Sequence, residues 1–189
     1  EIAAQTLTDR CGLLGYSYIS FEVSDAGEIV GRIPTTMDAA EFAKKISSIG
    51  LLEFVDFGQT PIKEGTTIRT DLENKYLPQV EGQEWHTVMS NDGIMTALAS
   101  KDPNYETYRI DFALTEKGTK IFFEHTSQNI GTYLGIVFDK SVIASPIIHD
   151  AIPSGQGVVS GNFTQETAEE LAAALQTKPL PFPIRLSNR

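Results

Sequence analysis

The second half of this sequence alternates strand-like and helix-like segments in an order that few folds accommodate. Four segments are predicted as strands, which are 108–114 with alternating polarity, the apolar run 133–138, and the proline-containing segments 142–148 and 180–186. Helical segments begin after Thr115 and after Thr164, and both threonines are typical N-cap residues. The resulting β-α-β-β-α-β order is typical of a ferredoxin-like sandwich, in which two helices cover one face of an antiparallel sheet.

The first sixty residues repeat this order without an opening strand. Ala3, Leu7 and Cys11 form a helical stripe, and a hairpin is predicted around the turn at residues 24–27. Asp38 caps a second helix, which precedes a strand over residues 51–57. The sequence therefore predicts an α+β protein of two ferredoxin-like lobes with antiparallel sheets. Either the first strand of the first lobe lies outside the sequence, or the C-terminal strand takes its place.

Residues 61–105 interrupt the pattern with prolines, glycines and polar residues. A short helix around residues 92–100 is the main element expected there, and the rest is interpreted as an irregular insertion. We therefore predict a base lobe of residues 1–60 and 179–189 and a head lobe of residues 61–178. Because the chain begins without Met and directly in a helical pattern, we expect it to be part of a longer protein.

Charge and cysteine content exclude several classes of function. The 15 basic and 25 acidic side chains give a net charge of −10, which argues against binding to nucleic acid or to anionic lipid. Cys11 is the single cysteine, so the chain forms no internal disulfide and no cysteine-based zinc site. No apolar run is long enough to span a bilayer.

The sequence shows no pattern of catalytic residues. His86, His125 and His149 lie far apart, and no nucleophile elbow, zinc-protease helix or phosphate-binding loop is present. The acidic pair Glu53 and Asp56 is interpreted as part of a solvated face. We therefore expect no enzyme activity, no catalytic residue, no metal and no cofactor.

A binding function is the remaining interpretation. Pro146 and Pro183 disturb predicted strands, and incompletely paired sheet edges can bind extended peptides through backbone hydrogen bonds. The alternative is that these prolines only protect the edges from aggregation, and the sequence alone favours that alternative.

From Phe112 onward the sequence resembles the SecD family of bacterial protein-translocase subunits. The similar segments are Phe112–Gly118, Thr126–Gly131, Leu134–Asp139, Val142–Ile147, Ile152–Gln156, Ser160–Thr164, Glu169–Ala172 and Leu180–Ile184. The resemblance is looser in the first sixty residues, at Gly12–Gly15 and Gly31–Pro34, and residues 60–105 do not align. One detail differs, because Ala144 and Ser145 are exchanged relative to the usual order before Pro146.

This resemblance implies a large extracytoplasmic domain with a ferredoxin-like base and a mobile head. Such a domain lies on the outer side of a bacterial cell membrane and binds unfolded preprotein emerging from the SecYEG channel. SecF and SecYEG are the implied partners. The proton-motive force would drive the movement through membrane helices that this chain lacks.

Two sets of residues are candidates for this function. The candidates for the preprotein groove are Tyr133, Ile143, Pro146, Ile148 and Phe163, and for each of them packing in the core is the favoured alternative. The candidates for the hinge between the lobes are Gly58, Thr60, Lys178 and Pro179.

Two other functions stay open. A ferredoxin-like small-molecule sensor is consistent with the predicted fold class alone. A hydrolase would require a cluster of histidine, carboxylate and nucleophile in the folded chain.

Overall fold

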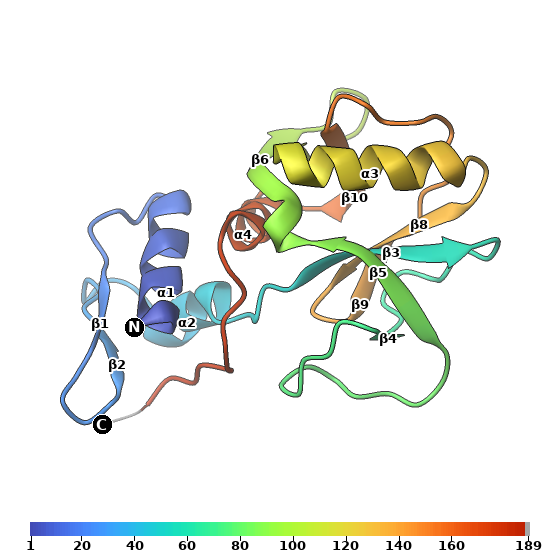
Figure 1. Cartoon of the computed structure of the whole chain (residues 1–189). Coiled ribbons are helices and arrows are strands. Elements are labelled where there is room, and N and C mark those ends of the chain that lie inside the picture. Colours follow the sequence, from blue (N-terminus) through green and yellow to red (C-terminus); the bar gives the residue numbers. More distant parts are fainter. Residues whose placement is uncertain (188–189) are drawn as a thin grey trace.

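The protein has two lobes, each built around its own hydrophobic core (Figure 1). The structure is a computed structural model that describes residues 1–187. We call residues 1–51 and 180–187 the small lobe and residues 52–176 the large lobe, and residues 177–179 connect them. The large lobe is thus inserted into the small lobe, and both Glu1 and the segment 180–187 lie in the small lobe.

The small lobe consists of two helices, a hairpin and the C-terminal segment. Its elements are α1 (Ile2–Leu13), β1 (Phe21–Val23), β2 (Ile29–Gly31) and α2 (Ala39–Ile46). The predicted cap of α2 is confirmed, because the Asp38 carboxylate accepts hydrogen bonds from the N–H groups of Ala40 and Glu41, both at 2.9 Å. Leu7 of α1, Phe42 of α2 and Leu180 meet in the core of this lobe.

The large lobe contains two sheets and two helices. Its elements are β3 (Leu52–Gly58), β4 (Arg69–Thr70), β5 (Glu84–Ser90), the 3-10 turn η1 (Asn91–Gly93), β6 (Ile94–Lys101), β7 (Tyr108–Leu114), α3 (Glu116–Gln128), β8 (Tyr133–Phe138), β9 (Ser141–Ala144), β10 (Gln156–Phe163) and α4 (Gln165–Gln176). A five-stranded sheet has the order β4-β5-β3-β8-β9, and a three-stranded sheet has the order β10-β7-β6. All pairs are antiparallel except the short β4–β5 pair.

The main core lies where both sheets meet α3 and α4. Three aromatic rings form its centre, Phe54 of β3, Phe112 of β7 and Phe122 of α3, with ring centroids 5.2–6.5 Å apart. A second cluster covers the other face of the five-stranded sheet and includes Phe57 and Val137. Thr115 and Thr164 cap α3 and α4 with their side chains, as predicted.

The α+β class with antiparallel sheets is confirmed, whereas the ferredoxin-like arrangement is not what the sheets show. The prediction placed residues 108–114 and 133–138 in one sheet, but β7 and β8 lie in different sheets. Strand β7 already pairs with β10 on one side and β6 on the other, so β8 finds no free edge there. It pairs instead with β3, a strand from the first sixty residues.

Residues 61–105, which were interpreted as an irregular insertion, contain β5 and β6. These strands pair with β3 and with β7. The helix predicted around residues 92–100 is wrong, because residues 94–101 form β6 and pair with β7 along their length. Ala97 faces the core there while Leu98 is 69% exposed, which is the alternation of a strand. Tertiary pairing overrides the helix propensity of Met, Ala and Leu. The predicted C-terminal strand is also absent, since residues 180–187 are irregular.

Candidate functional site: the joint between the lobes

The chain crosses between the two lobes at two places. Ile49 and Leu51 pack in the core of the small lobe, whereas Leu52 packs in the main core of the large lobe. On the return, Leu175 belongs to the large lobe and Leu180 to the small lobe. We call the polar residues that surround both crossings the joint, and these are Arg10, Gly50, Asn91, Asp139 and Thr177.

Arg10 is a buried cation that ties α1 to both crossings. Its guanidinium donates to the carbonyls of Ile46 (2.8 Å), Ser48 (2.6 Å) and Ile49 (3.0 Å), and its Nε donates to Thr177 Oγ1 (3.0 Å). Burial lowers the pKa of Arg10 to about 10, with the charge of Asp139 acting in the opposite direction. Arg10 therefore stays protonated at pH 7, and its charge faces the carbonyl end of α2.

Gly50 is the residue that lets Arg10 approach the first crossing. Its φ of +79° lies in the left-handed region, and a Cβ at this position would lie 2.2 Å from Arg10 Nη2. Both the backbone conformation and the available space therefore require glycine.

Asn91 and Asp139 reach the first crossing from the large lobe. Asn91 accepts the N–H of Leu52 (2.8 Å) and donates to the carbonyl of Gly50 (3.0 Å). Asp139 accepts the N–H of Leu51 (2.8 Å). Burial raises the pKa of Asp139, against the effect of the backbone N–H groups of residues 49–51 and of the Arg10 charge. The joint thus satisfies the buried polar backbone where the chain leaves one core for the other.

A groove of about 230 Å³ opens between the lobes. It is lined by Lys44, Lys45 and Ser48 of the small lobe and by Phe138, Ile143, Phe163, Thr167, Glu170 and Leu171 of the large lobe. An ion pair between Lys45 of α2 and Glu166 of α4 spans the two lobes. The hydrogen bond to Glu166 raises the pKa of Lys45, and burial raises the pKa of Glu170. The groove combines apolar walls with charges of both signs.

The structure brings two of the five groove candidates together. Ile143 and Phe163 both line the groove between the lobes. Ile148 is buried in the main core, and Tyr133 packs on the opposite face of the five-stranded sheet. Pro146 is exposed, and its carbonyl accepts the N–H of Leu134 at 2.9 Å.

The hinge candidates fall into two groups. Lys178 and Pro179 lie in the second crossing, between α4 and Leu180. Gly58 and Thr60 do not lie at a crossing, because β3 runs through the middle of the five-stranded sheet and Gly58 is at its far end beside Tyr133. The first crossing lies instead at residues 49–52, where Arg10 and Asn91 hold the backbone.

The polar residues of the joint were not predicted from the sequence. Arg10 had a signal, because it follows Leu7 by three residues and precedes Leu14 by four, on the apolar stripe of α1. Asn91 and Asp139 had none, since asparagine and aspartate are common in turns. Glu53 is also corrected: it is fully buried, not part of a solvated face.

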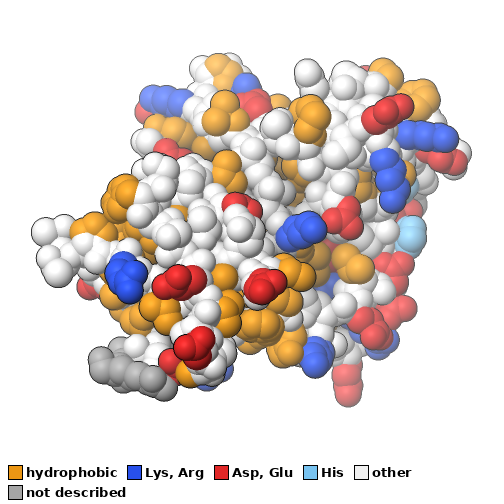
Figure 2. Space-filling view, turned by 60° about the vertical axis from the view of Figure 1, so that its left-hand side comes forward, with side chains coloured by type: hydrophobic (Ala, Val, Ile, Leu, Met, Phe, Trp, Pro, Cys, Tyr) orange, Lys and Arg blue, Asp and Glu red, His pale blue; other side chains and the backbone are white. Residues whose placement is uncertain are grey.

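A larger apolar groove of about 970 Å³ lies on the small lobe between the hairpin, α2 and residues 182–187, and Figure 2 shows hydrophobic side chains gathered on this side. Within residues 1–187, no three His, Cys, Asp or Glu side chains gather in a way that could hold a metal ion. None of the helices in this range is long and apolar enough to cross a membrane.

Comparison with known proteins gives a consistent result. The family model described as "SecDF, P1 head subdomain" matches residues 70–182. The protein translocase subunit SecD of Aquifex aeolicus is 30% identical over 192 residues, which cover 96% of this chain and 37% of that protein. SecD of Rickettsia conorii is 41% identical over 99 residues, 52% of this chain and 19% of that protein. The chain thus spans less than half the length of these relatives.

Solved structures of SecDF have the same fold. A crystal structure of SecDF in the super-membrane-facing form has a TM-score of 0.76 at 27% identity, covering 98% of this chain and 27% of that one. Another, from work on SecDF as a membrane component that enhances protein export, has a TM-score of 0.69 at 27% identity and covers 98% of this chain and 91% of that one.

Proposed function

We propose, from the premise that this chain belongs to the SecD family through its SecDF P1 head subdomain, that it is the extracytoplasmic part of a SecD-like protein-export subunit. The large lobe is then the head and the small lobe is the base. In this proposal we place the boundary between them at residues 51–52 and 177–179, where the chain passes from one core to the other, instead of at residues 60–61 and 178–179. The parent protein is held in a bacterial cell membrane by segments outside this chain.

In this function the domain binds unfolded preprotein leaving the SecYEG channel and moves its head relative to its base. The proton-motive force acts through membrane helices of the parent protein, with SecF as a partner. The domain itself is not an enzyme and needs no cofactor, because holding and releasing a chain requires no bond to be broken. The observation that supports this proposal best is the construction of the joint, where two separate cores are connected by two short crossings.

The groove between the lobes is the proposed preprotein site. Phe163 and Ile143 offer apolar surface to scattered hydrophobic side chains, and Lys44 and Glu170 flank it with both charges. Such a site can bind many different sequences with low affinity. Low affinity is needed because the bound chain must also be released. Because the groove has walls from both lobes, a movement of the head changes its width.

Titration of the ¹⁵N-labelled chain with a reduced, permanently unfolded polypeptide tests this function. We expect chemical-shift changes around Ile143 and Phe163, and about tenfold weaker binding for Phe163→Ala. Phe123→Ala is the matched control, because Phe123 is a 43% exposed phenylalanine of α3 that does not line the groove. Absence of shifts at millimolar polypeptide, or equal weakening by both variants, would contradict the proposal.

The groove on the small lobe supports a second candidate function. Its volume of about 970 Å³ and its apolar lining, including Phe21, Ile29 and Phe42, fit a small ligand of a sensor domain. A thermal-shift screen with amino acids, nucleotides and apolar metabolites separates the two functions. Only the sensor function predicts a rise in unfolding temperature with ligand concentration.

A further inference from the structure

Residues 71–83 leave the large lobe and return to it at one place. The flanking strands β4 and β5 pair in parallel, which sets Arg69 beside Glu84, and their side chains form an ion pair at 2.8 Å. Asp71 donates its N–H to the Trp85 carbonyl (3.0 Å) and accepts the N–H of Thr87 (2.8 Å). The two ends are therefore fixed side by side on the five-stranded sheet, as in an Ω-loop.

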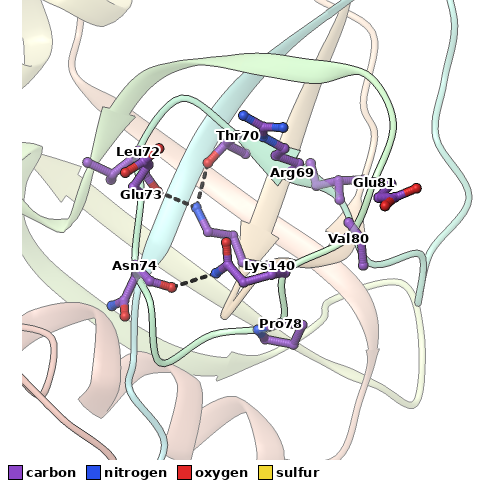
Figure 3. A pocket seen from close by; sticks show the side chains of 11 residues that line it. Arg69, Thr70, Leu72, Glu73, Asn74, Pro78, Val80, Glu81 and Lys140 are labelled. Carbon is purple, nitrogen blue, oxygen red and sulfur yellow. Dashed lines mark hydrogen bonds between the residues drawn. The ribbon is translucent and has the colours of Figure 1, made fainter.

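A buried ion pair holds the start of this segment on the large lobe. Lys140 Nζ donates to the Glu53 carboxylate (2.9 and 3.1 Å), to Thr70 Oγ1 (2.5 Å) and to the carbonyl of Leu72 (2.6 Å). Figure 3 shows Lys140 reaching Thr70 and Leu72 in a pocket of about 340 Å³ beneath the segment. Lys140 and Glu53 are 3% and 0% exposed. This end of the segment moves with the large lobe.

The middle of the segment is anchored in the other lobe. Leu77 is 7% exposed and packs in the core of the small lobe with residues such as Leu180. A local turn presents it, because Leu77 N–H donates to the Asn74 carbonyl (3.1 Å) and the Gln79 amide donates to the carbonyls of Asn74 (2.8 Å) and Leu77 (2.9 Å). Its apolar neighbours Leu72 and Tyr76 are 37% and 43% exposed.

We infer that residues 71–83 form a strap between the lobes, in which Leu77 is a removable anchor that sets the resting orientation of the head on the base. This inference rests on the proposed movement of the two lobes. A rotation about the joint leaves the crossings in place, but it must withdraw Leu77 from the small lobe, because the strap is fixed at Thr70 and Glu84 on the large lobe. Withdrawal exposes apolar surface in both lobes, so the strap favours the orientation seen here.

A distance measurement between the lobes tests the strap. Spin labels at Asp25→Cys in the hairpin turn and Lys120→Cys on α3 report the separation of the lobes by pulsed electron resonance, since both positions are exposed. Cys11 is buried and its burial raises its thiol pKa to about 11, so it reacts slowly with the label. We expect Leu77→Ala to raise the population of other separations at least about tenfold.

Leu72→Ala is the matched control, because it truncates an exposed leucine of the same strap and leaves the bond from Lys140 to its carbonyl. It should leave the distance distribution unchanged. Leu77→Met keeps an apolar side chain of similar volume and should restore the wild-type distribution. If Leu77→Ala impairs folding, the smaller truncation Leu77→Val should still broaden the distribution to a lesser degree.

The outcomes separate the strap from the proposed function. The distance distribution of the wild type could already be broad and stay unchanged in Leu77→Ala and Leu77→Val. This result would overturn the strap but leave the movement of the lobes intact. A single narrow distribution in the wild type and in both Leu77 variants would overturn both. Equal broadening by Leu72→Ala and Leu77→Ala would overturn the specific role of Leu77.

Discussion

Arg10 in the joint and Lys140 beneath the strap, the two buried cations among residues 1–187, are stabilised in different ways. Arg10 is 2% exposed and donates to three backbone carbonyls and a threonine hydroxyl, with no carboxylate within ion-pair distance among residues 1–187. Lys140 is 3% exposed and pairs directly with the buried carboxylate of Glu53. One cation is compensated by dipoles and the other by a full opposite charge.

The difference corresponds to what each cation connects. The partners of Arg10 come from the end of α2, from the first crossing and from the second crossing, so the arginine holds α1 to both connections between the lobes. Lys140, Glu53 and Thr70 all belong to the large lobe. A dispersed set of neutral acceptors suits a place where two lobes meet, whereas a tight ion pair suits a place that stays rigid within one lobe.

The largest expected effect concerns the ion pair. Lys140→Met leaves the Glu53 carboxylate buried without its countercharge and should lower the free energy of unfolding by about 3–5 kcal/mol. Lys101→Met is the control, because Lys101 forms an exposed ion pair with Glu106 and should change stability by less than about 1 kcal/mol. Urea denaturation measures both. A loss below about 1 kcal/mol for Lys140→Met would contradict this expectation, because it would mean that the buried Glu53 carboxylate does not need the lysine charge.

The second effect concerns the glycine of the joint. Gly50→Ala should lower the free energy of unfolding by about 2–4 kcal/mol. The alanine strains the left-handed backbone, and its Cβ also displaces the Arg10 side chain. Gly58→Ala has a similar φ of +56° but open space at its Cβ, so it should show the strain alone, about 1–2 kcal/mol. Equal losses for the two variants would show that contact with Arg10 contributes nothing.

A smaller effect is expected from one acceptor of Arg10. Thr177→Val keeps the side-chain shape and removes the hydroxyl that accepts from Arg10 Nε, so we expect a loss of about 1–2 kcal/mol. Thr60→Val, at an exposed position, is the control and should be neutral. Thermal unfolding measures both variants. If it detects no difference between them, the remaining backbone carbonyls are sufficient to stabilise the Arg10 charge, and the threonine hydroxyl is not needed.

The smallest effect is a change in pH dependence at Asp139. Because burial raises the pKa of this carboxyl above its unfolded value, its contribution to stability is present below the ordinary carboxyl pKa and is lost as the pH rises through the raised value. Asp139→Asn keeps an acceptor for the Leu51 N–H but cannot ionise. It should therefore be slightly more stable than wild type at pH 7 and lose this difference at pH 4. A variant that is less stable at pH 7 would show that the negative charge near Arg10 is required.

Local patterns predicted α1, α2, α3 and α4, although the helix predicted around residues 92–100 is wrong. Asp38, Thr115 and Thr164 were identified as N-caps, and each side chain accepts a backbone N–H in the structure. The hairpin around residues 24–27 and the strand over residues 133–138 are also confirmed. These features depend on side chains that interact with backbone a few residues away, which a single sequence contains directly.

Long-range pairing and the joint could not be predicted in the same way. β3 and β8 are more than seventy residues apart in the sequence, and neither strand contains a pattern that identifies the other as its partner. The sequences of β5 and β6 look polar and helical, and they become strands by pairing with β3 and with β7. Leu77 and Arg10 each carried a faint signal, as an apolar residue in a polar loop and a charge on an apolar stripe. Their roles depend on a second lobe that only the fold brings close.

The insertion of one lobe into the other has a consequence for biosynthesis. Leu180 fills the core of the small lobe, so that core cannot close until Leu180, which follows the whole large lobe in the sequence, has left the ribosome. Residues 52–176 are translated before Leu180 and contain both of their own sheets. Within residues 1–187, the small lobe therefore begins before the large lobe in translation and completes its core after it.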